Sequence, residues 1–392
     1  MTNLSSQRHA FQLDNATSYL NAAYMAPMPN ATASAVEESI KRMQHPHSIV
    51  AEDWFEPVNA LRQKYGEIIG TKDWERIAIT PSCSYGIANV AKHIKPFKGS
   101  NIVVTTGQFP SNYYTWAKVC GAFHCELRSV DPPKTPQRGR IWNERILDAI
   151  DSNTCLVSLP PLFHADGTRF QLEAVRTRCH EVGARLIVDG TQLIGAGEWD
   201  METIQPDALI CSGYKWLLGP YGTGMAFYGP AFDDASPIEE NWVIRTNSHD
   251  FRTLLDYSPD YRPVGMRLSS GEHAAFLHIP ALLASASLIS NWSVNGIASY
   301  TTQLFEPFET RFRELGCVFE EETYRYPHLL GIRFEQSVDL EQLNNHLRTN
   351  GVYVSVRDDV IRISLHVWNT TDDLEKLLQG ISTYLKSRNV TL

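Results

Sequence analysis

The 392-residue sequence lacks an excess of positive charge, paired cysteines and long apolar runs. Its formal net charge is −9 and no cluster of lysine and arginine stands out, which argues against a nucleic-acid-binding surface. No apolar run reaches the roughly 18–20 residues of a membrane span. Residues 1–8 are polar and do not form the apolar core of a signal peptide. We therefore expect a cytoplasmic protein that binds neither nucleic acid nor a membrane.

Cysteine and histidine spacing gives no sign of a metal site or a disulfide framework. The seven cysteines are scattered and include no C-x-x-C pair, which suits a reducing compartment. The thirteen histidines include no H-E-x-x-H or comparable ligand spacing. We predict no metal ion.

Short apolar runs alternate with helical segments in the first two thirds of the chain. Such near-continuous apolar strands predict an α/β fold with a mostly parallel sheet that helices cover on both faces. Right-handed crossovers then place the carboxyl ends of the strands at one edge, where ligands bind in open α/β sheets. The expected strands cover residues 76–80, 101–105, 155–159, 185–189, 208–212 and 224–228.

The pattern changes after about residue 270 and predicts a smaller α+β domain. Long helices are expected over 278–296 and 300–316, followed by a compact alternation of strands and helices. The strands are expected over 329–334, 352–356 and 360–365, and the helices over 339–350 and 372–386.

Lys215 and Asp189 follow two apolar runs that are expected to be neighbouring strands. A pyridoxal phosphate enzyme needs this pair, because the lysine forms an imine with the cofactor aldehyde and the aspartate keeps the pyridine nitrogen protonated. Gln192 follows closely and could hydrogen-bond the 3-oxygen of the cofactor. Taken singly, Lys215 could be a surface residue in a turn and Asp189 a helix cap.

An anion site is expected between the strand 76–80 and the next helix, because small side chains and free N–H groups at a helix N-terminus bind phosphate. The alternative is an ordinary capped helix start. The residues concerned are Ser82, Cys83 and Ser84, with Ser212 and Tyr214 as further hydroxyl donors.

Arg362 lies within the apolar strand 360–365. A cationic side chain there needs a partner, and arginine binds carboxylates bidentately. The partner is either the carboxylate of a substrate or a structural acidic residue.

With these residues in place, the sequence resembles fold-type-I pyridoxal phosphate enzymes of the class V aminotransferase group, over nearly its whole length. The group includes cysteine desulfurases, kynureninases and isopenicillin N epimerase-like proteins. The resemblance implies a seven-stranded sheet in a large cofactor-binding domain, residues 16–270, and a small domain made of 1–15 and 271–392. The similar segments are 188–192, 212–224, 362–370 and 19–23.

The resemblance also implies roles for individual residues. Cys83, Ser84, Ser212 and Tyr214 fall where the group binds the cofactor phosphate, and Phe109 falls where an aromatic ring stacks on the cofactor. His164 falls near the cofactor oxygen and the substrate, and Asn21 lies in the strand that borders the substrate pocket. Gly271 and Glu272 match a segment that reaches the phosphate of the neighbouring subunit, which implies a homodimer with shared active sites.

One departure from the group concerns the loop before Arg362. Desulfurases carry a nucleophilic cysteine there, whereas residues 354–359 contain none. We therefore expect an enzyme that acts at Cα of an amino acid by transamination and not by persulfide formation. The alternatives are a β-eliminating C–S lyase, an epimerase and, more remotely, a cofactor-binding protein without turnover.

Overall fold

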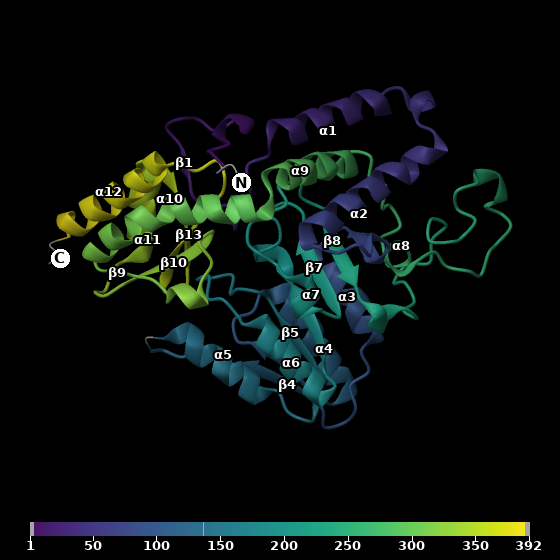
Figure 1. The fold of residues 1–392 in the computed structure, drawn as a ribbon, viewed down its shortest axis with the longest axis horizontal. Helices are drawn as coiled ribbons and strands as arrows, with labels where there is room; N and C mark the ends of the chain where they lie inside the picture. The colour runs from purple at the N-terminus through teal and green to yellow at the C-terminus, as the bar shows by residue number, and fades with distance from the viewer. Residues whose placement is uncertain (1–3, 136, 389–392) are drawn as a thin grey trace.

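Two main sheets organise the computed structural model, which describes residues 4–135 and 137–388 (Figure 1). The larger sheet has seven strands in the order β2-β8-β7-β6-β5-β3-β4. Strands β3 to β7 are parallel, and β8 is antiparallel to both of its neighbours. The prediction of a mostly parallel, seven-stranded sheet is confirmed. Its strands are β2 (Ile77–Thr80), β3 (Asn101–Thr105), β4 (Glu126–Val130), β5 (Thr154–Leu159), β6 (Arg185–Asp189), β7 (Ala208–Ser212) and β8 (Gly224–Tyr228).

Alternate residues of the strands enter different hydrophobic cores, so both faces of this sheet are covered. Ile102 and Ile210 pack into one core, whereas Val103 and Leu209 pack into the other. The first core includes side chains of α3 (Cys83–His93), α4 (Pro110–Phe123) and α8 (Val264–Arg267). The second includes side chains of α2 (Glu56–Ile69), α5 (Arg138–Ala149), α6 (Leu172–Val182), α7 (Met201–Ile204) and α9 (His278–Trp292). Helix α1 (Asn30–Met43) lies beside α9 (Figure 1).

Strand β4 is absent from the expected strands. It lies at the edge of the sheet and pairs only with β3 among the described strands. Its sequence is Glu-Leu-Arg-Ser-Val, and most of these side chains are partly or fully exposed. An edge strand with a polar sequence lacks the apolar run that identifies the buried strands.

The C-terminal part contains an antiparallel sheet in the order β12-β13-β10-β9, as the predicted α+β domain requires. The strands are β9 (Cys317–Val318), β10 (Leu329–Phe334), β12 (Ser355–Arg357) and β13 (Val360–Ser364). Its core also contains side chains of α10 (Val294–Glu314), α11 (Leu340–Thr349) and α12 (Thr371–Ser387).

The N-terminal segment lies beside this second sheet. Strand β1 (Ser18–Tyr19) pairs in parallel with β11 (Val352–Tyr353). The N-terminal residues therefore pack against the C-terminal part of the molecule, and only the following residues enter the large sheet (Figure 1). The domain boundaries at residues 16 and 271 stay predictions.

The boundary between the two long helices lies earlier in the chain than the expected one, which was between residues 296 and 300. Helix α9 ends at Trp292 and α10 begins at Val294. Ser293 between them has a φ of 58°, and its hydroxyl accepts a hydrogen bond from the backbone N–H of Gly296 at 3.0 Å. A serine that caps the next helix thus interrupts an apolar pattern that continues through the break.

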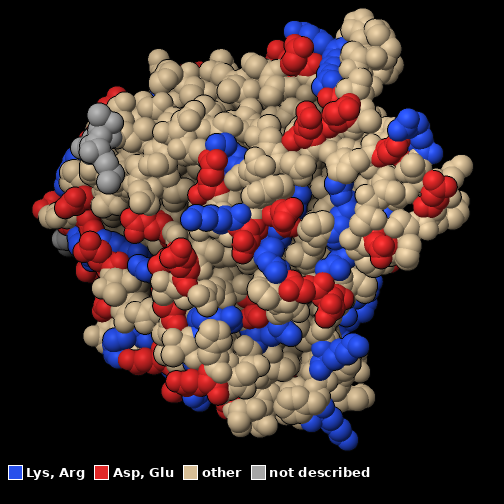
Figure 2. Space-filling view, turned by 45° about the vertical axis from the view of Figure 1, so that its right-hand side comes forward, with Lys and Arg blue, Asp and Glu red and all other residues tan. Residues whose placement is uncertain are grey.

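The surface carries charges of both signs. In the view of Figure 2, lysine and arginine side chains are interspersed with aspartate and glutamate. Among the residues that the structure describes, no helix is long and apolar enough to cross a membrane.

Candidate active site

A pocket lies at the carboxyl edge of the large sheet, at the ends of β6 and β7. The predicted site residues that line it are Cys83, Phe109, His164, Asp189, Gln192, Ser212, Tyr214 and Lys215. Of the others, Asn21, Ser82, Ser84, Gly271, Glu272 and Arg362 are not among the described residues that line it.

Lys215 follows β7, and only 6% of its surface is exposed. Its Nζ lies 5.5 Å from the ring centroid of Phe109 and 5.6 Å from that of Tyr214. Burial lowers the pKa of Lys215 to about 8, the negative charge of Asp189 opposes this change, and the charge of Arg362 adds to it. A buried lysine with a lowered pKa has the neutral amine available for imine formation and proton transfer.

Asp189 and Gln192 are oriented by hydrogen bonds within the protein. The carboxylate of Asp189 accepts from the backbone N–H of Thr191 at 3.1 Å. The side-chain oxygen of Gln192 accepts from Trp216 Nε1 at 2.9 Å, and its Nε2 donates to the carbonyl of Ala23 at 3.2 Å. One N–H of Gln192 Nε2 therefore remains for the predicted contact with the cofactor, which stays a prediction.

The N-terminus of α3 reaches the pocket through Cys83. Ser82 caps this helix, because its Oγ accepts from the backbone N–H of Tyr85 at 3.2 Å and lies 2.9 Å from the Oγ of Ser84. Burial raises the pKa of the Cys83 thiol, and Asp189 raises it further, so the thiol is neutral. Because the first N–H groups of a helix lack intrahelical partners, this end suits a phosphate.

Arg362 is 2% exposed and lies beside the pocket. Its Nη1 donates to the backbone carbonyl of His164 at 2.7 Å, whereas Nε and Nη2 have no hydrogen-bond partner among the described residues. Burial lowers the pKa of Arg362 to about 9, and the charge of Arg357 adds to this change. No ion pair is formed by Arg362 within residues 4–135 and 137–388, which removes the alternative of a structural acidic partner there.

His164 is neutral at physiological pH. Burial lowers its pKa to about 4, and the charges of Arg362, Lys215 and Arg357 add to the effect. Its ring meets that of Phe109 edge to face, with centroids 5.7 Å apart. A neutral imidazole can donate one hydrogen bond and accept another, which suits contacts with a cofactor oxygen or a substrate.

The three remaining predicted residues lie outside the pocket. The side chain of Asn21 accepts from Ser355 Oγ at 2.9 Å, and its backbone forms a parallel bridge with Ser364, the last residue of β13. Gly271 and Glu272 border a separate hollow, and the N–H of Gly271 donates to the carboxylate of Glu239 at 2.7 Å. The predicted roles of these residues at the substrate and at the neighbouring subunit stay predictions.

Four of the residues that line the pocket have no role predicted from the sequence, namely Gln108, Asn112, Pro160 and Thr191. Gln108 and Asn112 follow β3 and are buried, and the Nε2 and Nδ2 groups of their side chains have no partner among the described residues. The Oδ1 of Asn112 accepts from Trp116 and Ser158, so its amide is held firmly. Their position after a buried strand was the available signal, because ligands bind at such strand ends.

The sequence matches the family model for class-V aminotransferases over residues 16–377. The chain belongs to this family. A curated uncharacterised aminotransferase of Bacillus subtilis is 23% identical over 358 residues, which cover 90% of this chain and 91% of that protein.

Two solved structures show the same fold. The apo cysteine desulfurase of Thermococcus onnurineus aligns with a TM-score of 0.82 at 18% identity, over 99% of this chain and 100% of that one. A cystine C–S lyase, solved with its product cysteine persulfide, aligns with a TM-score of 0.81 at 18% identity, over 93% of this chain and 97% of that one.

Pyridoxal phosphate is the cofactor of the family, and the pocket fits it. It combines a helix N-terminus, a buried lysine and a carboxylate at the ends of adjacent strands. The unpaired amide groups of Gln108 and Asn112 offer donors to a polar ligand. No group of three metal-ligating side chains occurs among the described residues.

We predict that the lowered pKa of Lys215 makes the cofactor-free protein less stable near neutral pH. Between pH about 8 and 10.5 the unfolded chain binds a proton that the folded protein releases, so stability rises with pH in this window. Lys215→Met should raise the free energy of unfolding by up to about 3 kcal/mol at pH 7. Urea denaturation at pH 7, 9 and 10.5 measures this difference, which should shrink as the pH rises. A difference that is constant with pH would contradict the assignment.

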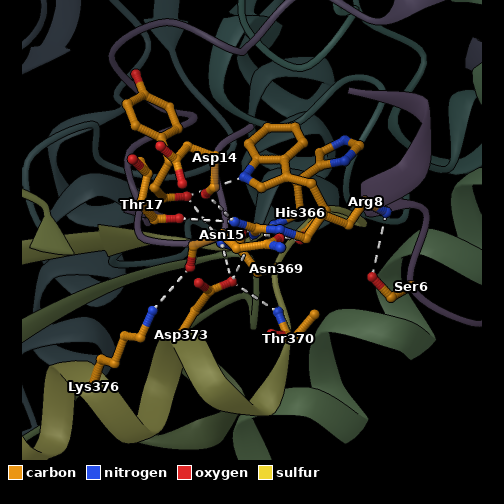
Figure 3. Close-up of polar contacts among 12 residues, drawn as sticks. Ser6, Arg8, Asp14, Asn15, Thr17, His366, Asn369, Thr370, Asp373 and Lys376 are labelled. Atoms are coloured by element: carbon orange, nitrogen blue, oxygen red, sulfur yellow. Dashed lines mark hydrogen bonds and ion pairs between the residues drawn. The ribbon is translucent and has the colours of Figure 1, made fainter. Parts of the chain in front are cut away.

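The N-terminal segment is fastened to the turn that follows β13 by Arg8 (Figure 3). Its Nη1 donates to the carbonyl of Trp368 at 3.3 Å and to Asp373 at 3.4 Å. Its Nη2 donates to the carbonyls of Asp14 and Thr17, at 2.9 Å each. One guanidinium thus joins the N-terminal segment to the segment that follows the strand of Arg362.

Arg8→Ala is expected to lower the free energy of unfolding by about 1–3 kcal/mol, because it removes charge-assisted hydrogen bonds from partly buried acceptors. Lys376→Ala is the matched control, since its Nζ makes one exposed bond to the carbonyl of Asn15 at 3.1 Å. This control should change stability by less than about 0.5 kcal/mol. Equal losses in the two variants, measured by urea denaturation, would contradict the special role of Arg8.

Proposed function

We propose that the chain is an enzyme that binds an α-amino acid by its carboxylate and removes the proton from its Cα, with transamination as the overall reaction. The buried guanidinium of Arg362 carries this proposal. Its Nε and Nη2 lack partners among the described residues, and it lies beside the pocket of Lys215. Bidentate carboxylate binding would satisfy these two groups.

Three residues in and beside the pocket would have separate roles in the transfer of the Cα proton. Bound pyridoxal phosphate would supply an electron sink for the broken Cα–H bond. Asp189 would hold the ring nitrogen protonated, and Lys215 would carry the proton from Cα. Arg362 would orient the substrate so that its Cα–H bond points toward Lys215.

Other residues would hold the cofactor in place. Phe109 would cover the cofactor ring, and Gln192 and His164 would contact its oxygen. The phosphate would bind at Ser82, Cys83 and Ser84, with Ser212 and Tyr214 as further donors. Asn21 would support the substrate side of the site through its bond with Ser355.

Elimination of a sulfur-bearing β-substituent is the second candidate. The likeness to a cystine C–S lyase supports it, and such a reaction begins with the same removal of the Cα proton. A desulfurase-type cysteine is not proposed. Residues 354–359 contain no thiol, and burial raises the pKa of Cys317 to about 12.

We also propose a homodimer with shared active sites. Gly271 and Glu272 line a hollow away from the Lys215 pocket, where a neighbouring subunit could contact them. Light scattering of the purified protein tests the oligomeric state.

A panel of single amino acids, followed by visible absorbance, tests the proposed reaction. Transamination yields a keto acid and the amine form of the cofactor, whereas elimination yields a keto acid with ammonia and a thiol. Epimerisation yields an inverted Cα centre. Turnover of no amino acid in the panel would refute the proposal and favour a cofactor-binding protein without turnover.

A further inference from the structure

A second arginine lies on the same face of the C-terminal sheet as Arg362. In the antiparallel pair of β12 and β13, Ser355 is opposite Arg362 and Arg357 is opposite Val360. Side chains two residues apart on a strand share a face, so Arg357 and Arg362 are diagonal neighbours on one face. Such diagonal positions lie about 7–8 Å apart, within reach of long side chains.

Arg357 has no acidic partner in the part of the chain that the structure describes. Its Nη1 donates a hydrogen bond to the carbonyl of the adjacent Val356 at 2.7 Å. Arg333 of β10 provides a contrast on the same face of the sheet, because it lies two residues after Gly331, which is opposite Arg362. It pairs with Asp166 at 2.9 Å and with Asp359 at 3.0 Å.

The charge of Arg357 acts on two residues of the candidate site, Arg362 and His164. It lowers the pKa of both Arg362 and His164, after the larger effect of burial. Arg362 in turn bonds the carbonyl of His164, and the His164 ring lines the Lys215 pocket. Arg357 therefore lies close enough to both Arg362 and His164 for its charge to act on them.

Two like charges on one face repel each other unless an anion neutralises them. One α-carboxylate can satisfy the free groups of Arg362 but leaves the charge of Arg357 without a counterion. A substrate with a second anionic group would supply that counterion.

We propose that Arg357 binds a carboxylate in the substrate side chain, so that the enzyme acts on acidic, dicarboxylic α-amino acids. This inference rests on the proposed function. Arg362 takes the α-carboxylate, Arg357 takes the side-chain carboxylate, and the Cα–H bond lies between them and Lys215. Amino acids with amide side chains of the same shape lack the charge that Arg357 recognises.

Steady-state kinetics with two isosteric pairs, aspartate with asparagine and glutamate with glutamine, tests the inference. The wild-type enzyme should favour the acidic member of at least one pair in kcat/KM by about 10- to 100-fold. Arg357→Gln should remove most of this preference by lowering kcat/KM for the acid and leaving the amide nearly unchanged. Arg357→Lys keeps the charge and should retain part of the preference.

Arg140→Gln serves as the control because it removes a positive charge from α5, where Arg140 pairs with Glu144. It should leave the acid-to-amide ratio unchanged. Equal losses for acid and amide in Arg357→Gln, or turnover of neutral amino acids without an acidic preference, would overturn this inference alone. A protein that turns over no amino acid would overturn the proposed function as well.

Discussion

Lys215→Ala is expected to lower kcat by about 10²- to 10⁴-fold and to abolish covalent retention of the cofactor. The side chain is buried within the pocket, and its lowered pKa makes the neutral amine available. Borohydride reduction of the wild-type protein, followed by peptide mapping, should find the cofactor on the peptide that contains Lys215. The variant should yield no such adduct.

Lys64→Ala provides the control for this experiment, since Lys64 is a half-buried residue of α2, outside the pocket, that pairs with Glu67. It should leave both the adduct and kcat unchanged. An adduct on another lysine of the wild-type protein, or full activity in Lys215→Ala, would show that the imine-forming residue has been misassigned.

Arg362→Gln is expected to reduce kcat/KM for amino acids by about 30- to 5,000-fold. This range corresponds to the roughly 2–5 kcal/mol lost when one partner of a buried charge pair is truncated. The visible band of the lysine-bound cofactor should remain, because the substitution leaves Lys215 and Asp189 in place. Arg362→Lys should restore only part of the activity, because an ammonium cannot form a bidentate pair with a carboxylate.

A substrate without a carboxylate separates recognition from structural damage. The slow reaction of a simple primary amine with the cofactor should be the same in Arg362→Gln and in the wild type. A loss of similar size for amine and amino acid would indicate that Arg362 supports the fold and does not bind the substrate. Urea denaturation of the variant provides an independent measure of its stability.

The buried part of the large sheet could be predicted from the sequence because its strands are local apolar runs. The expected strand 208–212 coincides with β7, and 185–189 coincides with β6. The hydrophobic pattern did not predict a strand that is incompletely buried, nor a helix boundary where a capping residue interrupts an apolar segment. Strand β4 and the break at Ser293 are the two examples.

The candidate pocket was predictable in its centre and less so at its margins. Lys215 and Asp189 follow buried strands, and the parallel arrangement brings their strand ends together. Gln108 and Asn112 have no distinctive spacing, and only the folded chain shows that their amide groups face the same pocket without partners.

The sequence by itself determined the mostly parallel sheet and the two residues at its carboxyl edge, because hydrophobic runs and strand direction are local properties. The residues that surround Arg362 could be identified only from the tertiary structure. The antiparallel register of β12 and β13 places Arg357 on its face, and the bond to His164 joins it to the large sheet. Register and docking depend on pairings between residues far apart in the chain, which no local pattern encodes.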